Sequence, residues 1–120
     1  MRELTGHKVN GLNEKLQISV LDEPGQGNAC HKYAISFNDS NKTLCSIDFQ
    51  NGPVNEVGFN GISNESLIEV VIDRLRGFQS GQFACRDNAV ALTKLEEAMM
   101  WLQKRTRDRI ARGVEGINKI

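Results

Sequence analysis

The change of hydrophobic period at Gly61 constrains the fold more than any other feature of this 120-residue sequence. Before it, apolar and polar residues alternate, which is typical of strands; after it, apolar residues recur every three or four positions, as on a helix. We expect one helix from an N-cap at Ser63 to a stop at Ser80-Gly81, and a second over about 85–112. The sequence therefore predicts a two-helix hairpin over residues 61–116.

The first helix carries a broad apolar surface, so we expect it to be covered on two sides. Ile68 and Ile72 widen a stripe made of five residues: Leu67, Val70, Val71, Leu75 and Phe78. The second helix is about 40 Å long at 1.5 Å per residue, which is more than the first helix can cover. Its far end is therefore expected to project or to pack on another chain. Met99, Met100 and Trp101 are interpreted as packing residues.

The first sixty residues predict a small antiparallel sheet. Residues 1–11 are polar and are interpreted as an irregular arm. Alternating segments follow over 16–20, 33–37 and 45–49, with turn clusters between them, and Val57 and Phe59 suggest a short fourth strand. We thus expect one α+β domain over 1–120, with a small N-terminal antiparallel β-sheet (12–60) followed by a C-terminal two-helix hairpin (61–116).

Composition narrows the class of protein. The formal net charge is zero and 39% of the residues are hydrophobic, so the chain is expected to fold. Cys30, Cys45 and Cys85 lie in three separate segments, which favours reduced thiols and a cytoplasmic location. No motif provides four metal ligands, no apolar run is long enough to span a membrane, and no signal-peptide core is evident. We therefore expect no metal, no cofactor and no membrane partner.

Catalytic motifs are also missing from the sequence. His7 and His31 accompany no recognisable nucleophile, and there is no P-loop, GxSxG or HExxH pattern. Glu96 and Glu97 are adjacent, so on a helix they point about 100° apart and cannot form a facing carboxylate pair. The sequence does not predict an enzyme, and no catalytic residue is assigned.

The end of the second helix is strongly basic. Five basic residues lie between Lys104 and Arg112, against the single acid Asp108. Such a local excess predicts an anionic partner. The alternative is a solvated basic face, because cations also suit the C-terminal end of a helix dipole.

The best candidate for a binding site combines this basic end with the hairpin loop. Phe78 and Phe83 could stack on a nucleobase, and Asn88 could hydrogen-bond to it. Arg105 and Arg109 share a helix face and could bind phosphate together; Arg112 follows nearby.

Each of these residues has a structural alternative. Phe78 could close the hairpin core, and Asn88 could be a first-turn residue tied to the backbone. The arginines could simply pair with Asp108 and Glu115.

Helix geometry separates the candidate groups. Asn88 and Arg105 are 17 positions apart, hence about 25 Å along one helix. No single small nucleotide can touch both in one chain. If both bind one ligand, the pocket must combine the loop end of one subunit with the basic end of another, as two antiparallel hairpins related by a two-fold axis would provide.

Several local motifs of the sequence are distinctive: Phe49-Gln50-Asn51-Gly52-Pro53, Asn60-Gly61, Asn64-Glu65, Asp73-Arg74-Leu75-Arg76-Gly77-Phe78-Gln79, Phe83-Ala84-Cys85-Arg86-Asp87-Asn88-Ala89, Lys94-Leu95-Glu96-Glu97-Ala98, Trp101-Leu102, Lys104-Arg105-Thr106 and Arg112-Gly113-Val114-Glu115-Gly116. Together these motifs, over roughly residues 30–116, resemble the first type of phage Thoeris anti-defence sponge, a family that shares its helical hairpin with a phage anti-CBASS sponge.

The resemblance implies sequestration without catalysis. Members of the family bind glycocyclic ADP-ribose, the signal made by a bacterial TIR-domain defence protein, in pockets between subunits of a homodimer or hexamer. By motif position, Phe78 matches the family's base-stacking residue and Asn88 its base-contacting residue, while Arg105 and Arg109 match its phosphate-side arginines. Arg112 and Phe83 are added to this set.

Three further possibilities stay open at this level. Some hexameric members bind cyclic trinucleotides at separate sites, but no basic residue lies between Lys42 and Arg74 to support such a site on the sheet. A nucleic-acid-binding protein would use the basic helix, although Glu96, Glu97 and Asp108 weaken a polymer track. A structural oligomerisation module would need no ligand.

Overall fold

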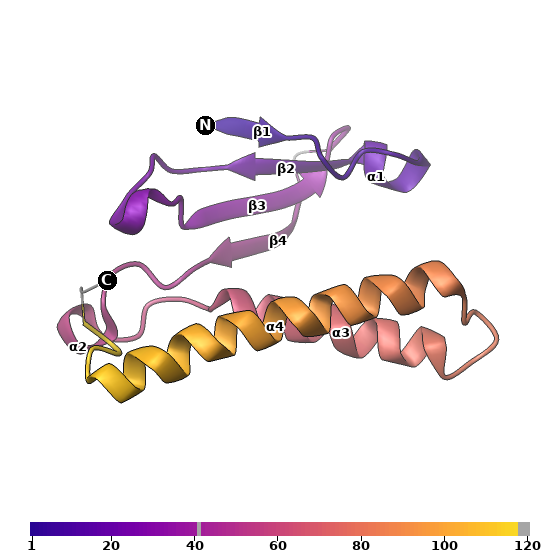
Figure 1. Cartoon of the computed structure of the whole chain (residues 1–120). Coiled ribbons are helices and arrows are strands. Elements are labelled where there is room, and N and C mark those ends of the chain that lie inside the picture. Colours follow the sequence, from indigo (N-terminus) through magenta and orange to yellow (C-terminus); the bar gives the residue numbers. More distant parts are fainter. Residues whose placement is uncertain (41, 118–120) are drawn as a thin grey trace. The chain divides into compact units, whose positions relative to one another are not determined.

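The structure, a computed structural model, describes residues 1–40 and 42–117 (Figure 1). These residues form two compact units that divide between Ile62 and Ser63. The first unit contains a four-stranded antiparallel sheet and the second a hairpin of two helices, so the predicted α+β class is confirmed. That the two units form one domain stays a prediction.

The sheet is a meander in which each strand pairs with the next. Its strands are β1 (Arg2–Leu4), β2 (Leu16–Val20), β3 (Lys32–Phe37) and β4 (Thr43–Asp48), in the order β1-β2-β3-β4. Val20 lies opposite Tyr33, which in turn lies opposite Ile47, and the Val20 side chain is fully buried. Val20, Tyr33 and Ile47 therefore share one apolar face of the sheet, as alternation along each strand requires.

The prediction of an irregular N-terminal arm is wrong. Residues 2–4 pair with β2 as the edge strand β1, and α1 (Gly11–Lys15) follows. The Asn10 side chain caps this helix by accepting the Asn13 N–H at 3.1 Å. His7 Nε2 donates to the Leu16 carbonyl oxygen at 2.7 Å, which ties the intervening segment to the start of β2. Non-local pairing therefore orders a polar segment that has no strong local pattern.

The predicted fourth strand at Val57 and Phe59 is also wrong. This segment forms the short helix α2 (Val54–Val57), with Pro53 as its N-cap and Gly58 at φ 76° as its C-cap. Proline fixes φ at a value suited to entering a helix, and glycine tolerates the positive φ that ends one. After α2 the chain returns along the end of β4, where Gln50 and Asn51 hydrogen-bond to Gly58 and Asn60 and an isolated parallel bridge joins Phe49 to Ile62.

The segment that leads into β3 is held by a carboxylate. It includes one 3-10 turn, η1 (Gln26–Asn28). Asp22 accepts the backbone N–H of His31 at 2.9 Å and of Lys32 at 3.1 Å. These hydrogen bonds, first the one from His31, hold the pKa of Asp22 below its ordinary value of 3.8.

The lowered pKa of Asp22 predicts how the free energy of unfolding depends on pH in acid. Because the folded pKa of Asp22 lies below its unfolded value, its stabilisation is fully present above pH 3.8 and is lost as the pH falls through the folded pKa. We expect Asp22→Asn to flatten the loss of stability below pH 3.8 in urea titrations followed by circular dichroism. An unchanged acid slope in the variant would contradict the assignment.

The first helix of the hairpin, α3 (Asn64–Gln79), begins as predicted at Ser63. The Ser63 side chain accepts the Ser66 N–H at 3.1 Å, and the Ser66 hydroxyl lies 3.2 Å from the Ser63 N–H in return. This reciprocal pair satisfies amides that the first helical turn leaves unpaired.

Removal of this cap should therefore weaken the hairpin. We expect Ser63→Ala to lower the free energy of unfolding by about 1 kcal/mol, measured by urea denaturation. Ser80→Ala, which removes a hydroxyl at the other end of α3, is the matched control. A cost no greater than that of the control would show that the cap is not stabilising.

The apolar surface of α3 is only partly covered. Ile72 is buried, whereas Val70 and Val71 are exposed. Within the described part of this chain one side of α3 is therefore left exposed, and its coverage on the second side stays a prediction. A single partner helix covers one stripe, so the second stripe stays available for another molecule.

The second helix, α4 (Arg86–Arg112), also has the predicted bounds. Cys85 is its N-cap, and Gly113 ends it in the left-handed conformation at φ 74°. Figure 1 shows α3 and α4 side by side, and an ion pair of 2.8 Å between Arg76 and Glu96 joins them. Among the described helices, none is both long enough and apolar enough to cross a membrane.

Candidate functional site

The loop end of the hairpin carries the predicted aromatic and amide groups. Phe78 lies in the last turn of α3, Phe83 in the loop, and Asn88 in the first turn of α4. The Arg74 guanidinium carbon lies 5.0 Å from the centre of the Phe78 ring, a cation–π contact that orients the ring. Phe83 is 68% exposed. These three predicted site residues therefore gather at one end of the hairpin.

A pair of hydrogen bonds fixes the shape of this loop. The Gln79 side-chain amide donates to the Cys85 carbonyl oxygen and accepts the Cys85 N–H, each at 3.1 Å. The contact that ties Asn88 to the loop comes from its backbone N–H, 3.4 Å from Cys85 Sγ. The N-cap Cys85 thus contacts the backbone of Asn88, and the side-chain amide of Asn88 takes no part in this cap.

The basic end of α4 brings the three predicted arginines together. A hollow of about 330 Å³ is lined by six residues: Trp101, Lys104, Arg105, Asp108, Arg109 and Arg112. Four of them are cationic and one is acidic, and Lys104 Nζ pairs with the Asp108 carboxylate at 2.7 Å. The net positive charge of this hollow suits a phosphate group.

Arg109 is set differently from Arg105. It is only 8% exposed, and its Nη2 donates to the carbonyl oxygens of Val114 at 2.8 Å and Ile117 at 2.9 Å. Its Nε lies 3.9 Å from the Glu115 carboxylate. These contacts clamp the turn that follows α4, whereas the Arg105 side chain is exposed. Phosphate binding by Arg109 stays a prediction, and the geometry gives its guanidinium a structural role.

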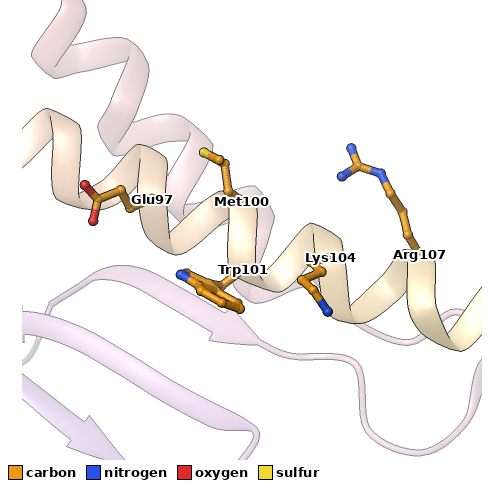
Figure 2. Close-up of a pocket in the computed structure, with 5 residues that line it drawn as sticks. All are labelled: Glu97, Met100, Trp101, Lys104 and Arg107. Atoms are coloured by element: carbon orange, nitrogen blue, oxygen red, sulfur yellow. The ribbon is translucent and has the colours of Figure 1, made fainter.

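The sequence interpretation missed a second surface of α4. Figure 2 shows five side chains along successive turns of this helix that line a hollow of about 370 Å³: Glu97, Met100, Trp101, Lys104 and Arg107. Met99 is buried, as expected of a packing residue, but Met100 is 66% and Trp101 70% exposed. Met100 and Trp101 are therefore not packed within the described part of this chain, and their packing against another chain stays a prediction. The spacing along the sequence could have indicated this surface, because Trp101 lies four residues before Arg105 and therefore on the same face of the helix.

The two adjoining hollows share Trp101 and Lys104. An exposed indole beside guanidinium groups can stack on a planar ring while the cations hold an anion. In the part of the chain that the structure describes, no cluster of three or more His, Cys, Asp or Glu side chains could hold a metal ion. The side chains around these hollows offer an aromatic face and positive charge, which suit an anionic ligand that contains a ring.

The structure keeps the two groups of site residues apart within one chain. Asn88 is in the first turn of α4 and Arg105 in its penultimate turns, so the 17 positions of continuous helix between them span about 25 Å. The loop end and the basic end are therefore two separate groups of candidate residues within one chain.

These features define a helical-hairpin protein with aromatic and amide groups at one end and a basic surface at the other. Residues 41–107 match the family model described as the Acb2/Tad1 hairpin domain. Because that match covers more than half of the chain, the protein belongs to the Acb2/Tad1 hairpin family, which confirms the resemblance found in the sequence. The matched segment contains Phe78, Asn88 and Arg105 and ends before Arg109.

A relative supports the same assignment. The chain is 58% identical over 76 residues to Thoeris anti-defense 1 of Bacillus phage SBSphiJ7, a match that covers 63% of this chain and 54% of the relative. The chain thus spans about half the length of the curated relative that it matches.

Proposed function

We propose that this protein is a phage-encoded immune evasion protein that captures glycocyclic ADP-ribose in the cytoplasm of the infected host and holds it without cleavage. The observation that carries the proposal is the division of ligand-binding groups between the two ends of a family-defining hairpin. The name of the Bacillus phage relative supports an anti-defence role, and a non-catalytic protein fits the binding-only chemistry of the site.

The loop end would hold the base of the ligand. Phe78 is oriented by Arg74 and supplies an aromatic face, while the side-chain amide of Asn88 can both donate and accept a hydrogen bond. Phe83 is exposed in the same loop and can cover the base from the other side.

The basic end would hold the two phosphates. Arg105, Lys104 and Arg112 line one hollow and supply the positive charge, and Trp101 forms an aromatic wall beside them. Arg109 would contribute either by holding the turn after α4 in place or by contacting a phosphate directly, and its substitution distinguishes these two roles.

The pocket itself would lie between two chains. The separation of about 25 Å prevents Asn88 and Arg105 of one chain from sharing a small nucleotide. Exposed apolar side chains occur along both helices of the hairpin, as a partner surface requires: Val70, Val71, Val90, Met100, Trp101 and Ile110. A homodimer, alone or within a hexamer, would form two equal pockets.

Cyclic trinucleotide binding has less support from this chain. The segment between Lys42 and Arg74 contains no basic residue, so a second anion site there would depend on backbone amides or on arginines borrowed from the helices. We propose the cyclic ADP-ribose isomer as the primary ligand.

A capture-and-release assay tests the proposal. The protein is incubated with glycocyclic ADP-ribose, separated from free ligand and heated, and the released molecule is analysed by chromatography and by its ability to activate the defence effector. We expect depletion of the free signal and release of intact, active signal. Release of a degraded product would identify an enzyme, and no depletion would leave only an assembly role.

A further inference from the structure

The sheet unit contains a small pocket of its own. Its volume is about 160 Å³, and six residues of the first unit line it: His31, Lys32, Asp48, Phe49, Asn51 and Asn60. None of them belongs to the groups proposed above for signal capture.

A buried histidine in this pocket has an unused polar atom. His31 is only 7% exposed, and its Nδ1 has no hydrogen-bond partner among the described residues. Its backbone N–H donates to Asp22 at 2.9 Å, which fixes the position of His31 at the entrance to β3. A buried ring nitrogen without a partner costs stability, which makes it a position prepared for an incoming group.

A glycine leaves space beside this nitrogen. A Cβ placed on Gly25 would lie 3.6 Å from His31 Nδ1 and 3.9 Å from Asn51 Oδ1. The two polar atoms therefore border the same space. The backbone of Asn51 is fixed there, because its N–H donates to Asn60 Oδ1 and its carbonyl accepts from Asn60 Nδ2, both at 2.7 Å.

The rest of the lining sets the size and charge of a ligand. Lys32 and Asp48 pair at 2.8 Å, so their formal charges cancel and an anion gains little. Phe49 adds an aromatic wall, and its ring is held edge-on by Tyr33 at 5.7 Å between centroids. A cavity of about 150 Å³ holds benzene in another protein, so this pocket has room for a single planar ring.

We propose that this pocket binds the base of a neutral nucleoside whose single ring presents an amino group next to a ring nitrogen, as cytosine does. The amino group would donate to Asn51 Oδ1, and His31 Nδ1 in its protonated tautomer would donate to the ring nitrogen. Adjacent donor and acceptor atoms of this kind are how side-chain amides read adenine. The proposal concerns a second ligand and different residues, so its test is independent of the test of signal capture.

Nuclear magnetic resonance of the two histidine rings provides the test. His7 is the internal control, because its Nδ1 is also buried and without a partner among the described residues, yet it lines no part of this pocket. We expect cytidine to shift the imidazole C–H signals of His31 in a saturable way and to leave those of His7 in place. Uridine, with a carbonyl in place of the amino group, should shift them much less.

Two variants make the outcome specific. Asn51→Ala keeps the backbone hydrogen bonds to Asn60 and should weaken nucleoside binding about tenfold, while Asn55→Ala on α2 should not change it. Arg105→Ala should also leave it unchanged. Unshifted His31 signals at saturating nucleoside would show that the pocket holds only water, and equal binding of uridine or of the Asn51 variant would overturn the assigned hydrogen bonds.

Discussion

Replacing Arg105 with alanine is expected to weaken the capture of glycocyclic ADP-ribose by about ten- to a hundredfold. Arg105 is exposed within a hollow of net positive charge, so its guanidinium is available to a phosphate. A hydrogen bond between charged groups contributes about 1.5–3 kcal/mol, and each 1.4 kcal/mol is roughly a factor of ten in affinity. Isothermal titration calorimetry with the purified ligand measures the loss.

The matched control is Arg107→Ala. This substitution removes the same charge from the same stretch of α4. Arg107, however, lines the neighbouring hollow and not the one around Arg105. We expect this variant to bind within a factor of about two of the original protein, because residues two positions apart on a helix do not face each other and an exposed charge is largely solvated. Equal losses in both variants would mean that only the general charge of α4 matters.

Arg109→Ala is expected to destabilise the hairpin by about 2–3 kcal/mol, an effect on folding before any effect on binding. The Arg109 side chain is buried and donates to two carbonyl groups beyond the end of α4, while its own carbonyl accepts the Val114 N–H at 3.0 Å. Loss of the guanidinium removes hydrogen bonds from a charged donor and leaves buried acceptors unsatisfied. Urea denaturation followed by circular dichroism measures the change.

Arg105→Ala serves as the control here, with an unfolding free energy within about 0.5 kcal/mol of the original, as expected of a surface substitution. Arg109→Lys should recover only part of the stability, because a single ammonium group cannot reproduce the two-carbonyl geometry of a guanidinium. If Arg109→Ala instead folds as stably as the original protein and loses capture, Arg109 is a ligand contact and the clamp is unimportant.

The hairpin could be predicted from the sequence because its determinants are local. The cap at Ser63, the stop at Ser80 and the left-handed Gly113 each act over a few residues, and the helical period between them is strong. The strands β2, β3 and β4 followed from alternation for the same reason.

The errors in the sheet unit have a non-local cause. Nothing within residues 2–4 specifies a strand, and β1 exists because β2 offers it an edge. Near Val57 the short alternating pattern favoured a strand, but Pro53 and Gly58 set the backbone for one helical turn. Short segments of this kind are decided by pairing and turn geometry, which a pattern of apolar residues does not contain.

Side-chain roles at the site were predicted less well than positions. The sequence placed Arg105 and Arg109 on one face, but only the turn after α4 distinguishes the exposed guanidinium from the buried one. Trp101 was interpreted with Met99 and Met100 as a packing residue, whereas within this chain it is exposed beside the arginines. Both differences depend on what surrounds the helix, which spacing along one chain does not reveal.

The central claim is that each pocket is formed by residues of two chains. Complementation between two inactive variants tests this claim most directly. Asn88→Ala and Arg105→Ala chains carrying different affinity tags are mixed, and the mixed dimer is purified and titrated with glycocyclic ADP-ribose. In a shared arrangement both defects fall in one pocket and the other is intact. We predict that the mixed dimer binds half as much ligand as the original protein, at the original affinity. No recovery in a verified mixed dimer would contradict the shared pocket.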